Sequence, residues 1–518
     1  MNRNIQLIIP MSGLGQRFID AGYKDPKPLI EVDGMPIIEH VYNLFPGIND
    51  VLFIINKDHA KTTNVKNILL KFCPFATIVE VDQAKKGPVF AVTQAIEHVK
   101  ENSEIILSYC DYGTEWNFKE FLKEVLKYDG MIPCYKGFHP HMLGSDNYAF
   151  CKENNKMLVE IKEKEPFTDN KMNEYASNGT YYFKTGKIVK QYFSELVDKN
   201  INIKGEHYIS LVYNLLVRDG LKVGIFEINK MLQWGTPYDL EIYKGWSNYF
   251  RLNFKKPVTA THSEDTVLVL PMAGRGSRFS ECGYDVPKPL LDVDGKPMIV
   301  KAVDCLPKIN KKIFICSQEH ITKYKLPQTL LKYYPKCSII GLDTTTAGQA
   351  CTCEIGIAGF KLSNETPILI SACDNGVVFD SEKYMKLVND ESVDVIVWSF
   401  RNNQTSKVAP NMYSWLDVDE NDNIKRVYCK NFVFDDPLKS HAIIGTMFFR
   451  KADYFLSGLK ANYKENLRTN NEFYVDDVIN QNIKAGLNVK VFEVENYICW
   501  GTPNDYKTYN YWKEYFIK

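Results

Sequence analysis

One long motif occurs twice in the sequence, and this repetition constrains the fold more than any other feature. The motif IIPMSGLGQRFIDAGYKDPKPLIEVDG begins at Ile8 and recurs without a gap, 261 residues further on, as VLPMAGRGSRFSECGYDVPKPLLDVDG. Arg17 therefore corresponds to Arg278, and Lys27 to Lys288. Glycines, prolines and basic residues that stay in register over such a length indicate two copies of one domain.

Shorter motifs downstream recur in the same order, with an offset that drifts only from 261 to 266 residues. A chain of 518 residues is also too long for a single hydrophobic core. We therefore predict one domain over residues 1–250, a polar linker over residues 251–265 and a second domain over residues 266–518. The recurring pairs are Gly87 and Gly348, Asp111 and Asp374, Lys164 and Lys430, Gly179 and Gly445, and Glu206 and Glu472.

The composition excludes several classes of protein. Lys+Arg and Asp+Glu both number 63, so a balanced net charge argues against nucleic acid or an anionic membrane as the main partner. Because no run of 18 apolar residues occurs, we expect no transmembrane helix. The 13 cysteines are scattered and lack a Cys-x-x-Cys pair, which is typical of reduced thiols in a cytoplasmic protein.

Strand-like and helix-like segments alternate in the first copy. Apolar runs at residues 51–55, 76–81 and 104–109 predict buried strands, and residues 89–99 have helical apolar spacing. This alternation predicts an α/β fold with mixed, mainly parallel sheets and crossover helices. Ligands of such sheets bind beyond the carboxyl ends of the strands, where both the glycine turn and Asp111 are expected.

The glycine turn that follows the first strand of each copy indicates phosphate binding. Glycines let the backbone approach a phosphate, and free N–H groups at the start of the next helix can bind anions. The alternative is an ordinary strand-to-helix turn, which the repetition of the whole motif disfavours. The predicted nucleotide-binding residues of the two turns are Met11, Ser12, Gly13, Gly15, Met272, Ala273, Gly274, Gly276 and Ser277.

Basic residues next to the turn can hold phosphate oxygens. Arg17 can grip them with two hydrogen bonds, and Lys27 is a stiffly placed cation between two prolines. Arg278 and Lys288 have the same setting in the second copy. The alternative is that these are simply surface cations.

An aspartate follows a buried apolar run in each copy, Asp111 after IILSYC and Asp374 after ILISAC. Mg²⁺ prefers such oxygen ligands and also binds substrate phosphates. The competing interpretation is a helix cap or a turn residue, but the repetition favours a metal ligand.

Later charged residues suggest an acceptor side. Lys164 and Lys430 can neutralise a second phosphate, and Glu163 and Glu206 can accept hydrogen bonds from sugar hydroxyls; the alternative is a solvated charge cluster. Trp234 begins a Trp-Gly-Thr-Pro motif that is either a turn with a core tryptophan or part of the pocket wall, and we favour the wall.

The motifs GLGQRF and GRGSRF, each followed by PKP, resemble the opening signature of the sugar-nucleotide pyrophosphorylase-type nucleotidyltransferases. The nearest resemblance is to the branch found in bacterial capsule and surface-polysaccharide loci, and it covers nearly the whole chain, twice. It implies two tandem Rossmann-like, GT-A-related domains that use Mg²⁺. It also implies the reaction of an NTP with a sugar 1-phosphate to give an NDP-sugar and pyrophosphate.

The resemblance also implies roles for individual residues. Arg17 and Lys27, with Arg278 and Lys288, would hold the NTP phosphates as catalytic residues, and Lys164 and Lys430 would act at the acceptor phosphate. The remaining assignments are Gly87, Gly348 and Gln349 beside the nucleobase, Asp111 and Asp374 on the metal, and Glu163, Gly179, Glu206, Gly445 and Glu472 at the acceptor.

The two copies depart from the family pattern in different ways. Gln233 and Cys499 occupy the position of a second metal-binding aspartate, and Cys429 replaces the glutamate that corresponds to Glu163. We therefore expect the acceptor pockets to differ. Alternatives are a cytidylyltransferase for a non-sugar phosphate, a glycosyltransferase, or one catalytic copy with a regulatory nucleotide-binding copy. Homo-oligomer formation stays open.

Overall fold

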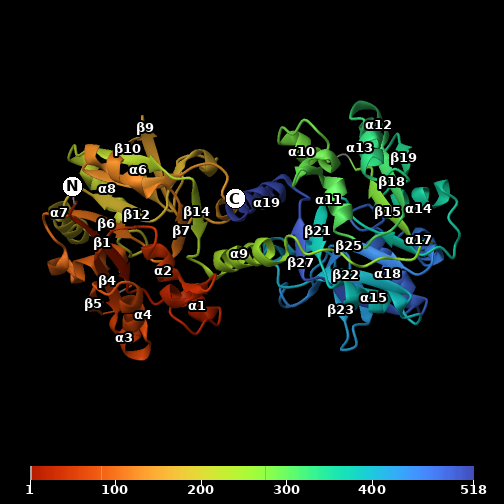
Figure 1. The fold of residues 1–518 in the computed structure, drawn as a ribbon, viewed down its shortest axis with the longest axis horizontal. Coiled ribbons are helices and arrows are strands. Elements are labelled where there is room, and N and C mark those ends of the chain that lie inside the picture. Colours follow the sequence, from red (N-terminus) through yellow and green to blue (C-terminus); the bar gives the residue numbers. More distant parts are fainter. Residues whose placement is uncertain (1–2, 83–84, 275) are drawn as a thin grey trace. The chain divides into compact units, whose positions relative to one another are not determined.

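The computed structural model describes residues 3–82, 85–274 and 276–518. The chain divides into two compact units, Met1–Ser247 and Asn248–Lys518 (Figure 1). Residues 251–265, the predicted linker, are included in the second unit. Within them Ala260 and His262 are buried, because they pack in that unit rather than extending through solvent.

The first unit is built on one ten-stranded sheet whose central strands follow one another as β5-β4-β1-β6-β12-β8-β13, with β10, β9 and β11 beyond (Figure 1). Its strands are β1 (Ile5–Met11), β4 (Asp50–Asn56), β5 (Thr77–Val81), β6 (Glu104–Ser108), β8 (Gly130–Tyr135), β9 (Ala149–Asn154), β10 (Met157–Glu163), β11 (Tyr175–Ser177), β12 (Thr180–Phe183) and β13 (Val223–Glu227). Two small ladders lie apart from it, formed by β2 (Glu31–Val32) with β3 (Met35–Pro36) and by β7 (Tyr112–Glu115) with β14 (Lys230–Gln233).

The second unit has a nine-stranded sheet with the order β19-β18-β15-β20-β25-β22-β26 and a hairpin, β23-β24, on β25. Its strands are β15 (Val267–Met272), β18 (Lys311–Ser317), β19 (Ser338–Leu342), β20 (Ile368–Ile370), β22 (Val395–Phe400), β23 (Trp415–Val418), β24 (Ile424–Tyr428), β25 (His441–Phe449) and β26 (Val489–Glu493). The small ladders are β16 (Asp292–Val293) with β17 (Lys296–Pro297) and β21 (Asn375–Val378) with β27 (Asn496–Cys499).

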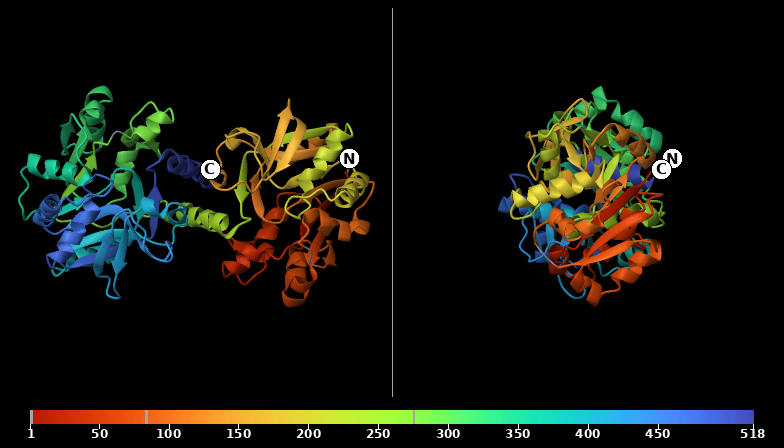
Figure 2. Two further views of the ribbon diagram at one scale, coloured as in Figure 1. Left: turned by 180° about the vertical axis from the view of Figure 1, so that it is seen from behind. Right: turned by 90° about the vertical axis from the view of Figure 1, so that its left-hand side faces the viewer.

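Helices connect the strands of both sheets, and Figure 2 shows each unit from two further directions. Those of the first unit are α1 (Gln16–Asp20), α2 (Ile37–Tyr42), α3 (Lys57–Thr62), α4 (Val65–Phe72), α5 (Pro88–Gln94), α6 (Phe118–Glu124), α7 (Gly186–Asp198) and α8 (Ile209–Arg218), and α9 (Pro237–Asn248) ends at the boundary. Those of the second are α10 (Ser277–Glu281), α11 (Met298–Asp304), α12 (Gln318–Lys323), α13 (Leu326–Tyr333), α14 (Gln349–Gly359), α15 (Ser381–Asn389), α16 (Thr405–Val408), α17 (Ala452–Glu465), α18 (Val475–Lys484) and α19 (Pro503–Phe516).

The strand directions confirm the α/β class and the mixed sheets. The seven central strands of the two sheets also match one for one. In the first, β5, β4, β1 and β6 run parallel, β12 is antiparallel to β6 and β8, and β13 is parallel to β8. In the second, the corresponding ladders have the same directions.

The prediction of mainly parallel sheets was wrong. In the first unit, only the strands β5-β4-β1-β6 and the pair β8–β13 are parallel. In the second unit, only β19-β18-β15-β20 and the pair β22–β26 are parallel. The other main ladders are antiparallel. Tight connections cause this. In the first unit, Asn155 and Lys156 form the turn between β9 and β10 with positive φ angles of 52° and 64°, and a short hairpin turn can join only antiparallel strands.

An asparagine clamps one helix to one strand in each unit. The Asn214 side chain of α8 accepts a hydrogen bond from the backbone N–H of Ile161 on β10 (2.9 Å) and donates one to its carbonyl oxygen (2.8 Å). Asn480 of α18 makes the same two bonds to Val427 of β24, at 2.8 and 2.9 Å. The two units therefore hold this helix and strand in the same register.

The tryptophan of the Trp-Gly-Thr-Pro motif belongs to the core. Trp234 and Trp500 are buried. A Cβ atom added at Gly113 or Gly376 would lie 2.8 Å from the Cη2 atom of the tryptophan packed against it. The tryptophan itself is therefore a core residue, because the glycine on the adjoining strand leaves space for the indole inside the unit, whereas Gly235 of the same motif lies beside Asp111.

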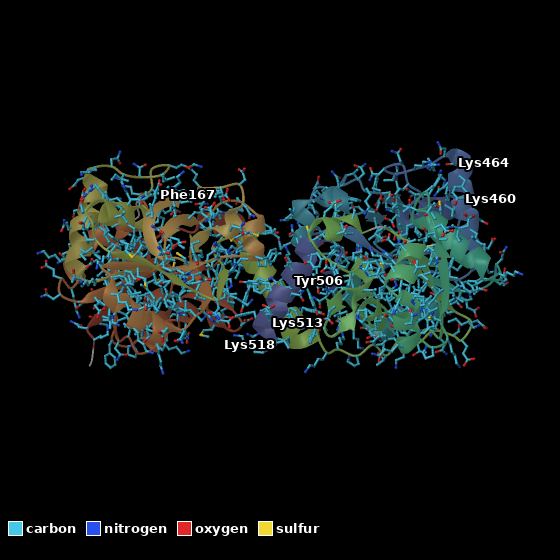
Figure 3. The ribbon with its side chains drawn as sticks, turned by 90° about the horizontal axis from the view of Figure 1, so that it is seen from above. Phe167, Lys460, Lys464, Tyr506, Lys513 and Lys518 are labelled. Carbon is cyan, nitrogen blue, oxygen red and sulfur yellow. The ribbon has the colours of Figure 1, made fainter. Side chains whose placement is uncertain are left out.

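Helix α19 packs within the second unit on the segment that follows the Pro-Lys-Pro motif. Two of its residues labelled in Figure 3 make the contacts: the Tyr506 hydroxyl donates to the Asp292 carbonyl oxygen (2.6 Å), and Lys513 pairs with Asp294 (2.9 Å). Among the residues that the structure describes, no helix is long and apolar enough to span a bilayer.

Candidate active site

The glycine turn leaves β1 and β15 with the same backbone conformation in both units. Gly15 and Gly276 have positive φ angles of 69° and 61°, a region that favours glycine. A Cβ atom added at Gly13 or Gly274 would meet no atom within 4 Å. The turn thus faces open space on the side where a phosphate is predicted to bind.

A lysine of the Pro-Lys-Pro motif pairs with the aspartate beyond the central strand in both units. Lys27 Nζ lies 2.6 Å from Asp111 Oδ2, and Lys288 Nζ lies 2.6 Å from Asp374 Oδ2. The side chains are largely buried, with 18% to 26% of their surface exposed. This brings a cation and a carboxylate that are far apart in sequence to the carboxyl end of the parallel strands.

The pKa values of both lysines and of Asp374 favour their charged forms. Burial opposes the ammonium form of Lys27, but the nearby Asp111 carboxylate outweighs it and raises the lysine pKa. The same balance of burial and Asp374 raises the pKa of Lys288. Burial likewise opposes ionisation of Asp374, yet Lys288 lowers its pKa below the ordinary value. A phosphate would find both lysines charged, and a metal ion in the second unit would find an ionised Asp374.

The arginine of the motif stands free at the surface beside this pair. Arg17 and Arg278 are exposed, and within the described residues neither guanidinium makes an ion pair. Arg17 is near enough to Lys27 that its positive charge opposes the rise in the lysine pKa, and Arg278 contributes to the lowered pKa of Asp374. Both guanidiniums can therefore turn to an anionic ligand without breaking an existing bond.

A cavity of about 180 Å³ opens beside the lysine–aspartate pair of the second unit. The predicted residues that line it are Met272, Gly274, Gly276, Lys288, Gln349 and Asp374. The sequence analysis did not single out the other lining residues, which are Pro271, Pro289, His320, Ala372 and Cys373. His320 recurs in the first copy as His59 at the offset of 261, a signal that could have marked it.

The other predicted turn residues lie nearby but make their contacts with the protein. Met11 and Ala273 are buried, whereas Ser277 is exposed at the start of α10. The carbonyl oxygen of Ser12 accepts a hydrogen bond from the Asn56 side chain (3.2 Å). These residues shape the turn from within.

Gly87 and Gly348 precede α5 and α14, where a second backbone segment comes very close. A Cβ atom on Gly87 would lie 2.6 Å from the His207 backbone nitrogen, and one on Gly348 would lie 2.5 Å from that of Phe473. Both glycines also have positive φ angles, 88° and 137°. Their position is set by this contact, which fixes the segment that carries the next predicted residue, Glu206 in the first unit.

The acceptor residues predicted for the first unit make two neighbouring sets of hydrogen bonds. Lys164 Nζ donates to the Tyr208 hydroxyl, which donates to the Glu206 carboxylate. Glu163 accepts a hydrogen bond from Ser210 Oγ (2.6 Å). Burial raises the pKa of Glu163 to about 7, although Ser210 and Lys164 oppose the shift. The group combines a cation with two carboxylates.

Two glycines lie where this group meets the central strand. In the first unit, the carbonyl oxygen of Gly179 accepts a hydrogen bond from the Tyr109 backbone N–H (2.9 Å). In the second unit, a Cβ atom on Gly445 would lie 3.6 Å from that of Ala372. Both glycines have positive φ angles, 94° and 90°.

The same region of the second unit is organised differently. Lys430 Nζ donates to the Met412 carbonyl oxygen (2.7 Å). Glu472 is exposed. Cys429 Sγ accepts a hydrogen bond from Ser414 Oγ (3.6 Å). The carboxylate that Glu163 supplies in the first unit is therefore absent from the strand here.

Mg²⁺ binds proteins through one or two oxygen ligands plus phosphates, and each unit has candidate donor atoms beside its aspartate. A Cβ atom on Gly235 would lie 3.0 Å from Asp111 Oδ2 and 3.3 Å from Gln233 Oε1, so both oxygens border one point. On Gly501 it would lie 3.2 Å from Asp374 Oδ2 and 3.4 Å from Cys499 Sγ.

The first unit thus offers two oxygen donors that fit Mg²⁺. The second offers one oxygen and a thiol whose pKa burial raises, and a protonated thiol is a poor ligand for a hard cation. No group of three or more His, Cys, Asp or Glu side chains suited to a metal occurs in the described part of the chain, so substrate phosphates would have to complete either coordination shell.

Comparison with known families gives a match within the first unit. Residues 7–163 match the model of the MobA-like NTP transferase domain. This segment contains the glycine turn, the lysine–aspartate pair and Glu163. The first unit therefore contains a segment that matches the MobA-like NTP transferase domain.

Solved structures of two nucleotidyltransferases resemble part of the chain. A nucleoside-diphosphate-sugar pyrophosphorylase from Vibrio cholerae RC9 is 23% identical over 46% of this chain and 99% of its own, with a TM-score of 0.40. An inositol-1-phosphate CTP transferase from T. maritima is 16% identical over 47% and 95%, with a TM-score of 0.37. Likeness at this level does not establish a function. A comparison with curated protein sequences gave no match.

Proposed function

We propose that the protein transfers a nucleoside monophosphate from an NTP to a phosphorylated acceptor, with one active site in each unit. The favoured acceptor is a sugar 1-phosphate, and the products are then an NDP-sugar and pyrophosphate. The resemblance of the motifs to the capsule and surface-polysaccharide branch motivates a role in that biosynthesis, in the cytoplasm. A non-sugar phosphate is the second candidate acceptor, which the replacement of Glu163 by Cys429 favours for the second unit.

One observation carries this proposal: the lysine–aspartate pair beside the glycine turn occurs in both units at the same distance of 2.6 Å. A nucleotidyltransferase needs positive charge for the triphosphate and a carboxylate for the metal at adjacent points. A core turn or a solvated charge cluster has no need for a buried pair of this kind. The shared strand order of the two units supports the same role for the second.

The reaction requires positioning more than acid–base chemistry. An oxygen of the acceptor phosphate attacks the α-phosphorus of the NTP, the bond from that phosphorus to the bridging oxygen breaks, and pyrophosphate leaves with the electron pair. Because the attacking oxygen is already anionic, no general base is required. Arg17 and Lys27 would orient and neutralise the triphosphate, and Lys164 the acceptor phosphate.

Mg²⁺ would supply further neutralisation of the phosphate oxygens. Asp111 with Gln233 would hold it in the first unit, and Asp374 in the second. Lys27 pairs with Asp111, so the residue that would hold the phosphate and the residue that would hold the metal lie side by side.

Pyrophosphate release tests the proposal. Each of the four NTPs is offered with Mg²⁺ and a panel of sugar 1-phosphates and other phosphorylated acceptors. We expect release with at least one combination, and the productive NTP should raise the thermal stability, since a ligand that binds only the folded state must do so. Failure of every NTP to bind would refute the enzyme hypothesis.

A further inference from the structure

The asparagine clamps make positions in the two units comparable one by one. Asn214 with Ile161, and Asn480 with Val427, fix the same register between helix and strand. Residues two apart on a strand share a face, and residues four apart on a helix share a face. In each unit, the strand residue two positions after the hydrogen-bonded strand residue therefore faces the helix residue four positions before the asparagine.

At these two facing positions, the units carry a carboxylate and a small side chain in opposite order. In the first unit they are Glu163 and Ser210, whose side chains form a hydrogen bond of 2.6 Å. In the second they are Cys429 and Asp476. The carboxylate has moved from the strand to the helix, and the small side chain from the helix to the strand.

Asp476 is placed to serve the acceptor. It is 7% exposed, and its charge interacts with both Cys429 and Lys430. Burial raises the pKa of Asp476, while Lys430 and a hydrogen bond to Ser414 oppose the shift. The adjacent Asp477 is held by Thr469 Oγ1 (2.9 Å). Cysteine has three fewer side-chain non-hydrogen atoms than glutamate, so the strand side chain that faces Asp476 is smaller than the one at the corresponding position of the first unit.

Building on the proposed function, we propose that Asp476 is the acceptor-binding carboxylate of the second unit and takes the place of Glu163. It accepts a hydrogen bond from a hydroxyl or amino group of a phosphorylated acceptor whose phosphate lies at Lys430. Because the Asp476 side chain is shorter than that of Glu163 and projects from a helix, the second unit selects acceptors whose hydroxyl or amino group reaches deeper into the site. The two units therefore use different acceptors.

The test isolates the second unit in an Arg17→Ala background. Pyrophosphate release is measured with each NTP and with sugar 1-phosphates, amino-sugar 1-phosphates and phosphocholine. For the acceptor that turns over, Asp476→Asn should raise the acceptor KM about tenfold, as expected for the loss of a hydrogen bond to a charged group, and leave the NTP KM within about twofold. Asp476→Glu should restore part of the loss.

Asp265→Asn is the matched control, because Asp265 is exposed two residues before β15, at the amino end of the strand and away from the site. In the same Arg17→Ala background, the paired change Cys429→Glu with Asp476→Ser should shift the acceptor preference toward that of the first unit, which is measured separately in an Arg278→Ala chain. An acceptor KM unchanged in Asp476→Asn, or an equal rise in the NTP KM, would overturn the inference. No pyrophosphate release by the unmodified protein would instead overturn the proposed function and the inference with it.

Discussion

The two units agree closely on the nucleotide side and diverge on the acceptor side. The lysine–aspartate distance is 2.6 Å in both, Lys27 to Asp111 and Lys288 to Asp374. On the acceptor side, Lys164 joins a hydrogen-bonded group in the first unit, whereas Lys430 donates to a backbone carbonyl in the second. Apart from Cys499 in place of Gln233 beside the aspartate, the divergence lies on the acceptor side, as we expect of two enzymes that share a donor chemistry and differ in the acceptor.

The largest expected effect tests whether both units work. Arg17→Ala and Arg278→Ala should each lower the turnover of their own unit by about 10²–10³-fold, the usual cost of removing one group that stabilises transition-state charge. The arginines are exposed, so the protein should still fold. Acceptor-specific pyrophosphate release is the measurement. If neither variant loses activity, the proposal of two active sites is wrong.

The next largest expected effect is a loss of folding stability when the close backbone contact shared by both units is disturbed. Gly87→Ala and Gly348→Ala each place a Cβ atom within 2.6 Å of a backbone nitrogen, and should destabilise their unit by about 2–4 kcal/mol. Thermal unfolding measures the loss.

Gly220 provides the control for the glycine variants. It also has a positive φ angle, 77°, but an added Cβ atom there meets nothing within 4 Å. Gly220→Ala should therefore cost only about 1–2 kcal/mol. Equal losses in all three variants would show that the close contact is not the cause.

The comparison of the two acceptor sites depends on the asparagine clamps, and removing a clamp should cost less folding stability than the glycine variants. Asn214→Ala and Asn480→Ala each leave a backbone N–H and a carbonyl group without a partner, at a cost of about 2 kcal/mol. Asn43→Ala, at an exposed position, should change the unfolding temperature little. A clamp variant as stable as the unmodified protein would undermine the shared register.

The smallest expected effect is a pH dependence confined to the first unit. Glu163 has a pKa of about 7, against an ordinary value of 4.5, chiefly because of burial. Its contribution to folding stability is therefore present below the ordinary pKa and is lost as the pH rises through about 7. Only the ionised carboxylate acts purely as a hydrogen-bond acceptor, because the protonated form also carries an O–H donor.

The acceptor KM of the first unit should therefore fall a few-fold between about pH 6 and 8. It is measured in the Arg278→Ala background, where Glu163→Gln should flatten the profile. A profile that Glu163→Gln leaves unchanged would assign the titration to another group, such as Asp239, whose pKa burial raises to about 6.

Local patterns predicted the strands well. The apolar runs at residues 51–55 and 104–109 correspond to β4 (Asp50–Asn56) and β6 (Glu104–Ser108). The antiparallel part of each sheet was missed because apolar spacing gives a strand's faces but not its direction. Lys27 and Asp111 could be named singly, yet their pairing joins residues 84 positions apart and needed the folded sheet.

Asp476 shows why part of the acceptor site stayed hidden. Its counterpart is Ser210, so a search for residues that recur in both copies passes over it. Its relation to Cys429 depends on how α18 lies on β24, which neither segment encodes by itself. Recurrence finds what the two units share, and only the structure shows what they exchange.

Equilibrium binding of NTP, measured as the number of molecules bound per chain in the presence of Mg²⁺, tests the central claim most directly. Each of the four NTPs is titrated separately into the unmodified chain, Arg17→Ala and Arg278→Ala. The lysine–aspartate pairs of the two units predict two nucleotide sites in the unmodified chain and one in each variant. A single site that only one of the two changes removes would show that one unit alone is a nucleotidyltransferase.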